Sequence, residues 1–370
     1  MPYEDRRRPI ALIVTPGYLP ILGGMERECA LLAQEFIRRG YEPVVITEQQ
    51  GMPVPPRERL DGVEVIRIPS RLKRSLALQL RVAARMAWLV LRHRRRAAFA
   101  VVRTMTLPAL AVGLLKRLRL IRFPTLVTAE TGVDVAALRE RPLYPVSRML
   151  ASAHDCLNGL SQANVEDLRA GGFPEAKISS IPNGVDTSVW QTARAPDRVG
   201  RLLFLGRLDP AKGVFELVEA FADVWSRHSS LRLTFAGDGP ARRTLEARCA
   251  EFGITEVVEF AGRVPYEDVG PLFDRVDCVV LPSYSEGMPL SILEAAAHRR
   301  VLVVTDVGDL RLLFGDRVHF APPRDAEGLA EVLERVVTAE RPDVDYADVL
   351  EKVSIDAVAE AMFTRLGVRP

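Results

Sequence analysis

A repeated alternation of short apolar runs and amphipathic stretches constrains the fold of this chain more than any other feature. The first apolar run is IALIVT (10–15), which is typical of a strand buried on both faces of a parallel sheet. Residues 25–36 follow with apolar side chains at helical spacing, and Gly40 ends that segment. Because such units repeat, the sequence predicts an α/β protein in which helices join parallel strands and cover both faces of each sheet.

The pattern falls into two blocks. The further strands expected in the first block are 43–47, 63–68, 99–102, 124–128, 156–160 and 178–181, and those in the second are 201–206, 231–237, 257–262, 277–283 and 301–306. Pro, Asn and Gly interrupt the pattern at IPNGVD (181–186). We therefore expect an N-terminal Rossmann-like domain (1–183), a C-terminal Rossmann-like domain (184–350) and a final helix (351–370) that packs back toward the N-terminal domain.

The composition is that of a soluble globular protein. Of the 370 residues, 48% are hydrophobic and 26% are charged. No run of about 18 apolar residues is present, and no signal segment follows the charged N-terminus. The four cysteines are scattered singly, which argues against a disulfide framework or a zinc site and favours a reducing compartment. The sequence therefore predicts a cytoplasmic protein that holds no metal.

Positive charge is concentrated in one part of the chain. Residues 65–129 contain fifteen Lys and Arg and no Asp or Glu, although the net charge of the whole chain is only +2. In 71–96 and 114–123 the cations alternate with apolar residues, which favours a basic amphipathic surface attracted to anionic lipid. Ordinary helices with solvated Arg faces remain an alternative. Nucleic-acid binding would suit the charge, but no interleaved aromatic residues accompany it. We therefore expect an anionic membrane surface, and no nucleic acid, as the partner.

Two cations follow the first strand of the second block. The stretch LGRLDPAKG (205–213) places Arg207 directly after that strand and Lys212 at the start of the next helix. In open α/β sheets, ligands bind beyond the carboxyl ends of the strands, and a helix N-terminus adds positive potential there. The arrangement favours a diphosphate site, although two solvated surface charges would show the same spacing. It is not a Walker A loop, because the chain has no Gly-Lys-Ser/Thr.

Two glutamates flank the start of a later helix. The stretch PSYSEGMPLSILEA (282–295) places Glu286 on the loop after a strand and Glu294 one to two turns into the helix. Gly287 leaves the backbone amides of 287–290 uncovered, which suits an anionic group. A carboxylate on the first turns of such a helix can accept both hydroxyls of a ribose. Taken alone, this spacing of glutamates is also common by chance.

Two further motifs carry less information. Gly23 and Gly24 follow the first strand and precede a helix, where a glycine pair lets a ligand approach the backbone. They lack the G-x-G-x-x-G spacing of dinucleotide sites. The run DVD (343–345) follows no strand, and we interpret it as a loop rather than a metal site.

Together these motifs resemble those of the GT-B glycosyltransferases of family 4, which carry an E-x7-E motif. The resemblance covers nearly the whole chain and rests on six stretches in order: GGMERECALLAQEFIRRGYEPVVIT, ISSIPNGVDTSVW, LLFLGRLDPAKGVFELVEAFADV, LRLTFAGDGPARRTLE, VEFAGRVPYEDVGPLFDRVDCVVLPSYSEGMPLSILEAAA and VLVVTDVGD. It implies two doubly wound domains that face each other across a cleft. It also implies a retaining, metal-independent transfer of a sugar from a nucleotide-sugar donor.

The resemblance implies roles for particular residues. Arg207 and Lys212 would hold the donor diphosphate and neutralise charge on the leaving group. Glu294 would bind the ribose hydroxyls, and Glu286 would bind hydroxyls of the transferred sugar. The catalytic residues implied are Glu286, Arg207, Lys212 and Glu130. The donor-binding residues implied are Gly23, Gly24, Gly206, Arg207, Lys212, Gly262, Val264, Glu286, Gly287, Met288, Pro289, Leu290 and Glu294.

The chain departs from the family pattern at two positions. Glu130 lies where family members usually carry a histidine, and Gly308-Asp309 lies where they often have Gly-Gly. A carboxylate can bind a sugar hydroxyl or position an acceptor. It does not supply the neutral donor and acceptor of an imidazole.

The expected function is sugar transfer from a UDP- or GDP-sugar to a glycan or lipid-linked acceptor, in surface polysaccharide or glycolipid biosynthesis. No cofactor is expected beyond the donor itself, and the protein would lie in the cytoplasm or peripherally on the cytoplasmic membrane face. One alternative is a weakly active or inactive sugar-nucleotide-binding protein of a glycan assembly complex. Another is a nucleotide-sugar epimerase of the same fold, which should lack the combination of E-x7-E with GRLDPAKG.

Overall fold

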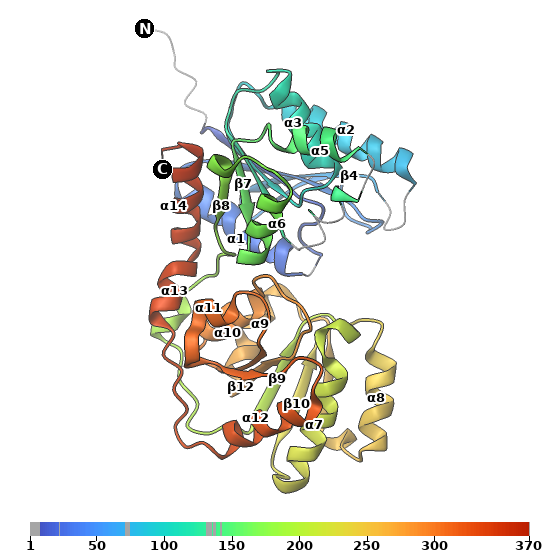
Figure 1. Cartoon of the computed structure of the whole chain (residues 1–370), viewed down its shortest axis with the longest axis vertical. Helices are drawn as coiled ribbons and strands as arrows, with labels where there is room; N and C mark the ends of the chain where they lie inside the picture. The colour runs from blue at the N-terminus through green and yellow to red at the C-terminus, as the bar shows by residue number, and fades with distance from the viewer. Residues whose placement is uncertain are drawn as a thin grey trace. The chain divides into compact units, whose positions relative to one another are not determined.

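The structure is a computed structural model that describes residues 8–21, 23–70, 75–130, 135, 138–140 and 143–369. The chain forms two compact units (Figure 1). Unit 1 contains the chain up to Gly184, except for 22–24, and the segment from Ile355 onward. Unit 2 contains Val185–Ser354 together with 22–24. The boundaries expected from the sequence, after residues 183 and 350, lie one and four residues before those of the structure.

Unit 1 is built on an eight-stranded sheet with the strand order β3-β4-β2-β1-β5-β6-β7-β8. The strands are β1 (Ile10–Val14), β2 (Glu42–Glu48), β3 (Arg57–Leu60), β4 (Val63–Ile68), β5 (Ala97–Arg103), β6 (Thr125–Ala129), β7 (Cys156–Gly159) and β8 (Ile178–Ser180). All neighbouring strands are parallel except β3 and β4, which are antiparallel. Strand β3 was not predicted, because its sequence RERL offers one apolar residue and none of its side chains is fully buried. The sheet is therefore parallel, as predicted, with one antiparallel strand added at its edge.

Helices cover both faces of this sheet, as parallel strands require. They are α1 (Gly24–Arg38), α2 (Leu76–Arg92), α3 (Leu107–Arg117), α5 (Tyr144–Ala151), α6 (Gln162–Ala170) and α14 (Ile355–Leu366), with a short 3₁₀ turn η1 (Glu175–Lys177). Helices α1 and α14 share one hydrophobic core with one face of the sheet, and α2, α3 and α6 share a second core with the other face. The expected strands of the first block therefore lie between two layers of helices.

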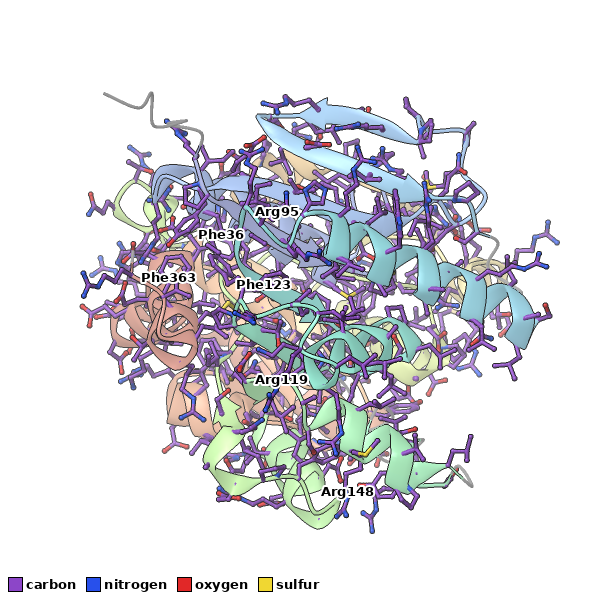
Figure 2. The ribbon with its side chains drawn as sticks, turned by 90° about the horizontal axis from the view of Figure 1, so that it is seen from above. Phe36, Arg95, Arg119, Phe123, Arg148 and Phe363 are labelled. Atoms are coloured by element: carbon purple, nitrogen blue, oxygen red, sulfur yellow. The ribbon has the colours of Figure 1, made fainter. Side chains whose placement is uncertain are left out.

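The C-terminal helix α14 belongs to unit 1, although it follows unit 2 in the sequence (Figure 1). Its Phe363 ring stacks on Phe36 of α1 at 5.8 Å and meets Phe99 of β5 edge-on at 5.3 Å; Phe36 and Phe363 are labelled in Figure 2. Arg39 donates hydrogen bonds to Glu360 at 2.6 Å and to Asp356 at 2.9 Å. Aromatic packing thus fixes α14 on the sheet, and Arg39 ties its polar side to the end of α1.

Unit 2 is built on a six-stranded parallel sheet with the order β11-β10-β9-β12-β13-β14. Its strands are β9 (Arg201–Leu205), β10 (Arg232–Ala236), β11 (Val258–Gly262), β12 (Cys278–Leu281), β13 (Val301–Thr305) and β14 (His319–Ala321). Its helices are α7 (Val214–Arg227), α8 (Arg242–Glu251), α9 (Tyr266–Asp274), α10 (Leu290–Ala297), α11 (Leu310–Phe314), α12 (Ala326–Thr338) and α13 (Ala347–Val353). Short 3₁₀ turns are η2 (Ser188–Gln191), η3 (Pro210–Lys212), η4 (Thr255–Val257) and η5 (Gly315–Arg317).

The strand order reverses once in each unit. In unit 2 the chain runs outward from β9 through β10 and β11, and then returns to place β12 on the other side of β9. In unit 1 the reversal lies between β1 and β5. At such a reversal the two following loops leave in opposite directions and open a crevice at the carboxyl ends of the strands, where ligands of α/β proteins bind.

Candidate active site

The reversal in unit 2 brings together two of the motifs that the sequence analysis singled out. Strands β9 and β12 are neighbours, and Leu202 and Leu203 pair with Cys278 and Val279. The loop after β9 contains Arg207 and Lys212, and the loop after β12 contains Glu286. Residues about 75 positions apart in the sequence therefore meet at one edge of the sheet.

Lys212, Glu286 and Ser283 form a hydrogen-bonded group at this edge. The Lys212 ammonium donates to Glu286 Oε1 at 2.6 Å, and the Ser283 hydroxyl donates to the same oxygen at 2.6 Å. Thr305, at the end of β13, donates to the Ser283 carbonyl and so fixes the loop from behind. Lys212 and Glu286 keep 32% and 12% of their side-chain surface exposed, so the pair is open to solvent on one side. An ammonium has three protons, so its bond to Glu286 uses one and leaves two for a ligand.

Glycines make this close approach of loops possible at two points. Gly213 has φ +66°, and a Cβ there would lie 1.9 Å from the Pro282 carbonyl oxygen. Gly308 has φ +63°, and a Cβ there would lie 2.4 Å from the Glu286 carbonyl oxygen. Its neighbour Asp309 has φ −96°, an ordinary value for any residue. The second glycine that the family often has at this point is therefore not needed by this backbone.

The remaining residues expected to bind a donor fall into two groups. Most follow strands of unit 2 or lie at the start of α10, and two glycines lie at the start of α1. Arg207 follows β9 with its side chain 70% exposed, and its Nε lies 3.7 Å from Asp209 Oδ2. Glu294 is the fifth residue of α10 and is only 8% exposed. The others are Gly206 after β9, Gly262 and Val264 at the end of β11, and Gly287, Met288, Pro289 and Leu290 around the start of α10. Gly23 precedes α1, and Gly24 is its first residue.

A tyrosine that the sequence analysis did not single out lies beside this group. Tyr284 donates a hydrogen bond from its hydroxyl to Glu216 Oε1 at 2.5 Å. The Arg324 guanidinium lies 4.7 Å from the centre of the Tyr284 ring. Burial and the Glu216 carboxylate raise the pKa of Tyr284 to about 12, so its hydroxyl stays protonated. The one sequence signal for Tyr284 was its position in the loop that follows β12, directly after Ser283.

In unit 1, Glu130 also lies at the carboxyl edge of the sheet, directly after β6. Its Oε1 accepts a hydrogen bond from Arg103 Nε at 2.5 Å, and Arg103 is the last residue of β5. Arg103 Nη1 lies 2.5 Å from Glu28 Oε2 on α1. Neither Arg103 nor Glu28 was predicted as a site residue from the sequence. A charged residue that ends an apolar strand next to the strand reversal was the available signal.

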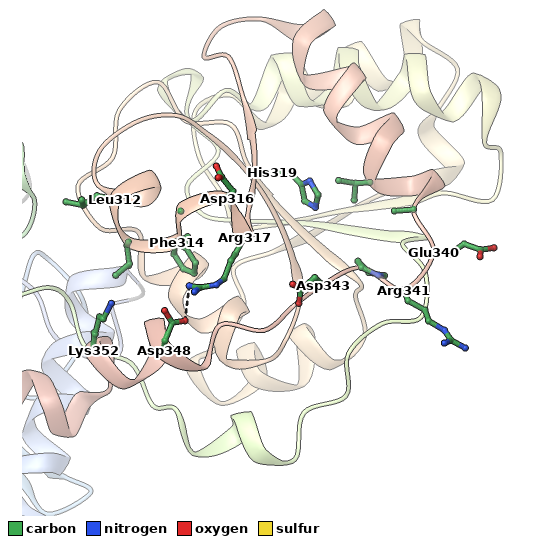
Figure 3. A pocket seen from close by; sticks show the side chains of 15 residues that line it. Leu312, Phe314, Asp316, Arg317, His319, Glu340, Arg341, Asp343, Asp348 and Lys352 are labelled. Carbon is green, nitrogen blue, oxygen red and sulfur yellow. Dashed lines mark ion pairs between the residues drawn. The ribbon is translucent and has the colours of Figure 1, made fainter.

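A hollow of about 720 Å³ lies elsewhere on unit 2 (Figure 3). His319 and Phe314 lie on its wall, and an ion pair of 2.8 Å between Arg317 and Asp348 crosses its rim. Because His319 is the first residue of β14, the hollow lies at the amino end of that strand, away from the edge that carries Lys212. None of the expected site residues lines it.

The described residues contain neither a metal-ligand cluster nor a membrane-spanning helix. In these parts of the chain no His, Cys, Asp and Glu side chains are grouped in a way that suits a metal ion. Within the same ranges, no helix has the length and apolar character needed to cross a membrane.

The motifs match two family models. The model described as "Glycosyltransferase Family 4" matches residues 22–189, and that described as "Glycosyl transferases group 1" matches residues 191–350. The chain belongs to glycosyltransferase family 4. The two matched regions correspond to units 1 and 2, and the fold of this glycosyltransferase is GT-B.

Individual relatives agree with this assignment. The glycosyltransferase is 31% identical over 208 residues to a glycogen synthase of Mycobacterium tuberculosis, which is 55% of this chain and 50% of that protein. It is 40% identical over 134 residues to the putative teichuronic acid biosynthesis glycosyltransferase TuaC of Bacillus subtilis, which is 36% of this chain and 32% of that protein. These matches span about half and a third of the relatives' lengths. The crystal structure of Anabaena HepE in complex with UDP and glucose superposes with a TM-score of 0.75 at 16% identity, covering 97% of this chain and 99% of that one.

Proposed function

We propose that this glycosyltransferase transfers a sugar, with retention of anomeric configuration and without a metal ion, from a nucleotide-sugar donor to a glycan or lipid-linked acceptor. The observation that carries the proposal is the contact between Lys212 and Glu286 at the strand reversal of unit 2, where Arg207 follows the neighbouring strand β9 with its side chain exposed. Cations at the carboxyl edge of a parallel sheet suit a diphosphate, and a carboxylate beside them suits sugar hydroxyls.

The donor would lie along the loops after β9 and β12. Arg207 and Lys212 would hold the diphosphate, and Glu286, already oriented by Ser283 and Lys212, would hold hydroxyls of the sugar. Glu294 would bind the ribose. A UDP-sugar is the donor that we propose, because HepE, a protein of the same fold, was crystallised with UDP and glucose.

In the reaction, the bond between the anomeric carbon and the diphosphate oxygen breaks, and the acceptor hydroxyl oxygen bonds to that carbon. The hydroxyl proton passes to the released diphosphate. The negative charge that builds on the diphosphate is stabilised by the Lys212 ammonium and the Arg207 guanidinium, which take the place of a divalent cation. Glu130 would bind a hydroxyl of the acceptor on unit 1.

A surface of unit 1 supports a lipid-linked acceptor. Helices α2, α3 and α5 pack side by side, and none of the three contains an acidic residue (Figure 2). Of eleven large apolar side chains that are exposed in the described residues, nine lie on or next to these helices: Leu76, Leu80, Trp88, Leu114, Leu118, Leu120, Leu143, Val146 and Met149. We call this the amphipathic face.

Cations surround these apolar side chains. Arg119 and Arg148, both exposed, are labelled in Figure 2. Trp88 lies between two arginines, with the Arg85 guanidinium 4.3 Å and the Arg92 guanidinium 5.6 Å from its ring. Residues 71–74 of the expected basic segment lie outside the described residues, and Arg67 and Arg103 of that segment are buried in ion pairs. An anionic lipid surface suits the exposed part, since apolar side chains can enter the interface while arginines bind headgroups.

Vesicle sedimentation tests the membrane part of the proposal. The protein should bind vesicles that contain anionic lipid at low salt, bind less at high salt, and ignore neutral vesicles. Leu118→Ser combined with Leu120→Ser should weaken binding. Leu312→Ser, which changes a side chain of unit 2 that is 77% exposed, should not. Equal binding of both variants would remove the amphipathic face from the account and make a soluble acceptor the better choice.

A second candidate function is sugar-nucleotide binding without transfer. It is favoured by one observation: Glu130 stands where family members usually have histidine, and its carboxylate is engaged by Arg103. A donor screen separates the two functions. Thermal shift and hydrolysis would be measured with UDP-, GDP- and ADP-sugars, on the wild type and on Glu294→Ala. Stabilisation with slow consumption of one donor, both lost in the variant, supports transfer. Stabilisation without consumption, even with membrane extract as acceptor, supports the binding protein.

A further inference from the structure

Three charged side chains form a continuous row at the carboxyl edge of the unit 1 sheet. Arg103 Nη1 is ion-paired with Glu28 at 2.5 Å, and Arg103 Nε donates to Glu130 at 2.5 Å. The remaining Nη2 lies 3.4 Å from the side-chain oxygen of Asn183. One guanidinium therefore joins α1, β5 and the loop after β6, through an ion pair with Glu28 and a hydrogen bond that orients the Glu130 carboxylate.

The row has a buried end and an accessible end. Glu28 is 0% and Arg103 1% exposed, whereas Glu130 keeps 14% of its side-chain surface. The buried end is held by the backbone as well, because the Gly184 amide donates to Glu28 Oε1 at 3.3 Å. Since removing charges from water is costly, a buried row of this kind persists only when each charge is compensated by its neighbour. The side chain at the accessible end is the one that a ligand can reach.

The pKa values agree with this arrangement. Burial lowers the pKa of Arg103, but the carboxylates of Glu130 and Glu28 together raise it by more, so it lies above its ordinary value. Burial raises the pKa of Glu28, and the Arg103 guanidinium opposes that change. Glu26, on the same helix, has its pKa raised by burial and, to a smaller extent, by the charge of Glu130. The Arg103 guanidinium thus compensates the negative charge of the Glu28 and Glu130 carboxylates.

The backbone beside Arg103 is strained. Thr104, the next residue, has φ +67°, a left-handed conformation that a β-branched residue rarely adopts. Such strain is unfavourable and concentrates at functional sites. The turn after β5 therefore keeps an unfavourable backbone conformation directly beside Arg103.

We propose that Arg103 is the positioning residue of this glycosyltransferase: it fixes the Glu130 carboxylate at the accessible end of the row, and Glu28 in turn fixes Arg103. The inference rests on the proposed function, in which Glu130 contacts the acceptor. In that role the Glu130–Arg103 pair replaces the histidine of other family members. The carboxylate accepts a hydrogen bond from a sugar hydroxyl while the guanidinium holds it still.

The test is a double-mutant cycle on turnover at saturating donor, with Glu130→Gln, Arg103→Lys and the double variant. A lysine keeps the positive charge but cannot span two carboxylates as the guanidinium does. Each single variant should lose at least tenfold in kcat, and the double variant should be no slower than the worse single one, since both act through Glu130. Donor affinity, measured by thermal shift, should not change, because Arg207 and Lys212 are untouched.

A control separates positioning from stability. Arg300 of unit 2 is also buried and donates to the carbonyls of His298 and Val276, at the opposite edge of its sheet. Arg300→Lys should lower the midpoint of thermal unfolding without lowering kcat. Wild-type kcat in Arg103→Lys, losses that multiply in the double variant, or loss of donor affinity would each overturn the role of Arg103. If the wild type consumes no nucleotide-sugar at all, the proposed function fails, and the inference built on it fails with it.

Discussion

The carboxyl edges of the two sheets use their cations in opposite ways. In unit 2, Arg207 is 70% exposed and Lys212 is 32% exposed, so both are available to an anionic ligand. In unit 1, Arg103 is 1% exposed and lies between two carboxylates. Edges that arise from the same kind of strand reversal thus differ in the exposure of their cations: unit 2 presents positive charge to solvent, and unit 1 buries it between carboxylates.

The largest effect on stability is expected from Arg103→Met. Removal of the guanidinium leaves Glu28 buried without its counter-charge, which should lower the free energy of unfolding by about 3–5 kcal/mol. The matched change Arg207→Met, at an exposed site, should change it by no more than about 0.5 kcal/mol. Peptide-resolved hydrogen exchange reads each unit separately. Equal loss of protection in the two variants would contradict the contrast.

The largest effect on activity is expected from Lys212→Met. Loss of a cation that stabilises the leaving group should lower kcat/KM by about a hundred- to a thousandfold. Lys352→Met is the control, because Lys352 also belongs to unit 2 but lines the hollow away from the strand reversal. The measurement is kcat/KM by steady-state kinetics with the donor identified in the screen. Similar losses of kcat/KM in both variants would contradict a specific role of Lys212 in stabilising the leaving group.

Low pH should destabilise unit 1 through His154. This residue is fully buried between the Thr125 hydroxyl, 3.1 Å from Nδ1, and the Ala109 carbonyl, 3.0 Å from Nε2. Burial lowers its pKa to about 4 from 6.5. The folded state therefore disfavours the charged form: the contribution to stability is complete above pH 6.5 and is lost as the pH falls toward 4, about 3 kcal/mol in all. Denaturation across this range should show the wild type losing about 3 kcal/mol of stability relative to His154→Gln as the pH falls. A parallel loss in both would refute this assignment.

The smallest expected difference between a variant and its control concerns the loop contact at Gly213. Gly213→Ala and Gly253→Ala both place a Cβ at positive φ, +66° and +69°, but only the first meets a backbone oxygen, that of Pro282. Gly253→Ala should cost about 1–2 kcal/mol. Gly213→Ala should cost about 1–3 kcal/mol more, because the loop that carries Lys212 must move. Donor affinity should fall in Gly213→Ala only. Unchanged affinity in that variant would mean that the loop contact does not position Lys212.

Sequence reasoning predicted the elements whose pattern is local. The strands β1 and β9 were predicted from their apolar runs, because a strand that is buried on both faces is mostly apolar. Because Lys212 and Glu286 each follow a strand, the sequence predicted that both lie at the carboxyl edge of a sheet. The strand order, in which β9 and β12 are neighbours, then brings them together. Strand β3 was missed because RERL, at the edge of the sheet, is paired by its backbone rather than by buried side chains.

The row formed by Glu28, Arg103 and Glu130 could not be predicted for a different reason. Each residue alone is a charged side chain that belongs on a surface by default. Its burial is possible only because partners from three elements, up to about 100 residues apart in the sequence, supply the opposite charge. Such compensation is a property of the tertiary structure. The sequence contains the three residues but not their pairing.

The most direct test of the account measures binding and turnover separately. Donor affinity by calorimetry and donor consumption by nucleotide release would be measured for the wild type, Lys212→Met and Glu130→Gln. The account predicts that Lys212→Met loses affinity for the donor, and that Glu130→Gln binds it as the wild type does but consumes it at least tenfold more slowly. Normal affinity in Lys212→Met, or an equal loss of affinity in Glu130→Gln, would contradict the division of tasks between the two sheet edges.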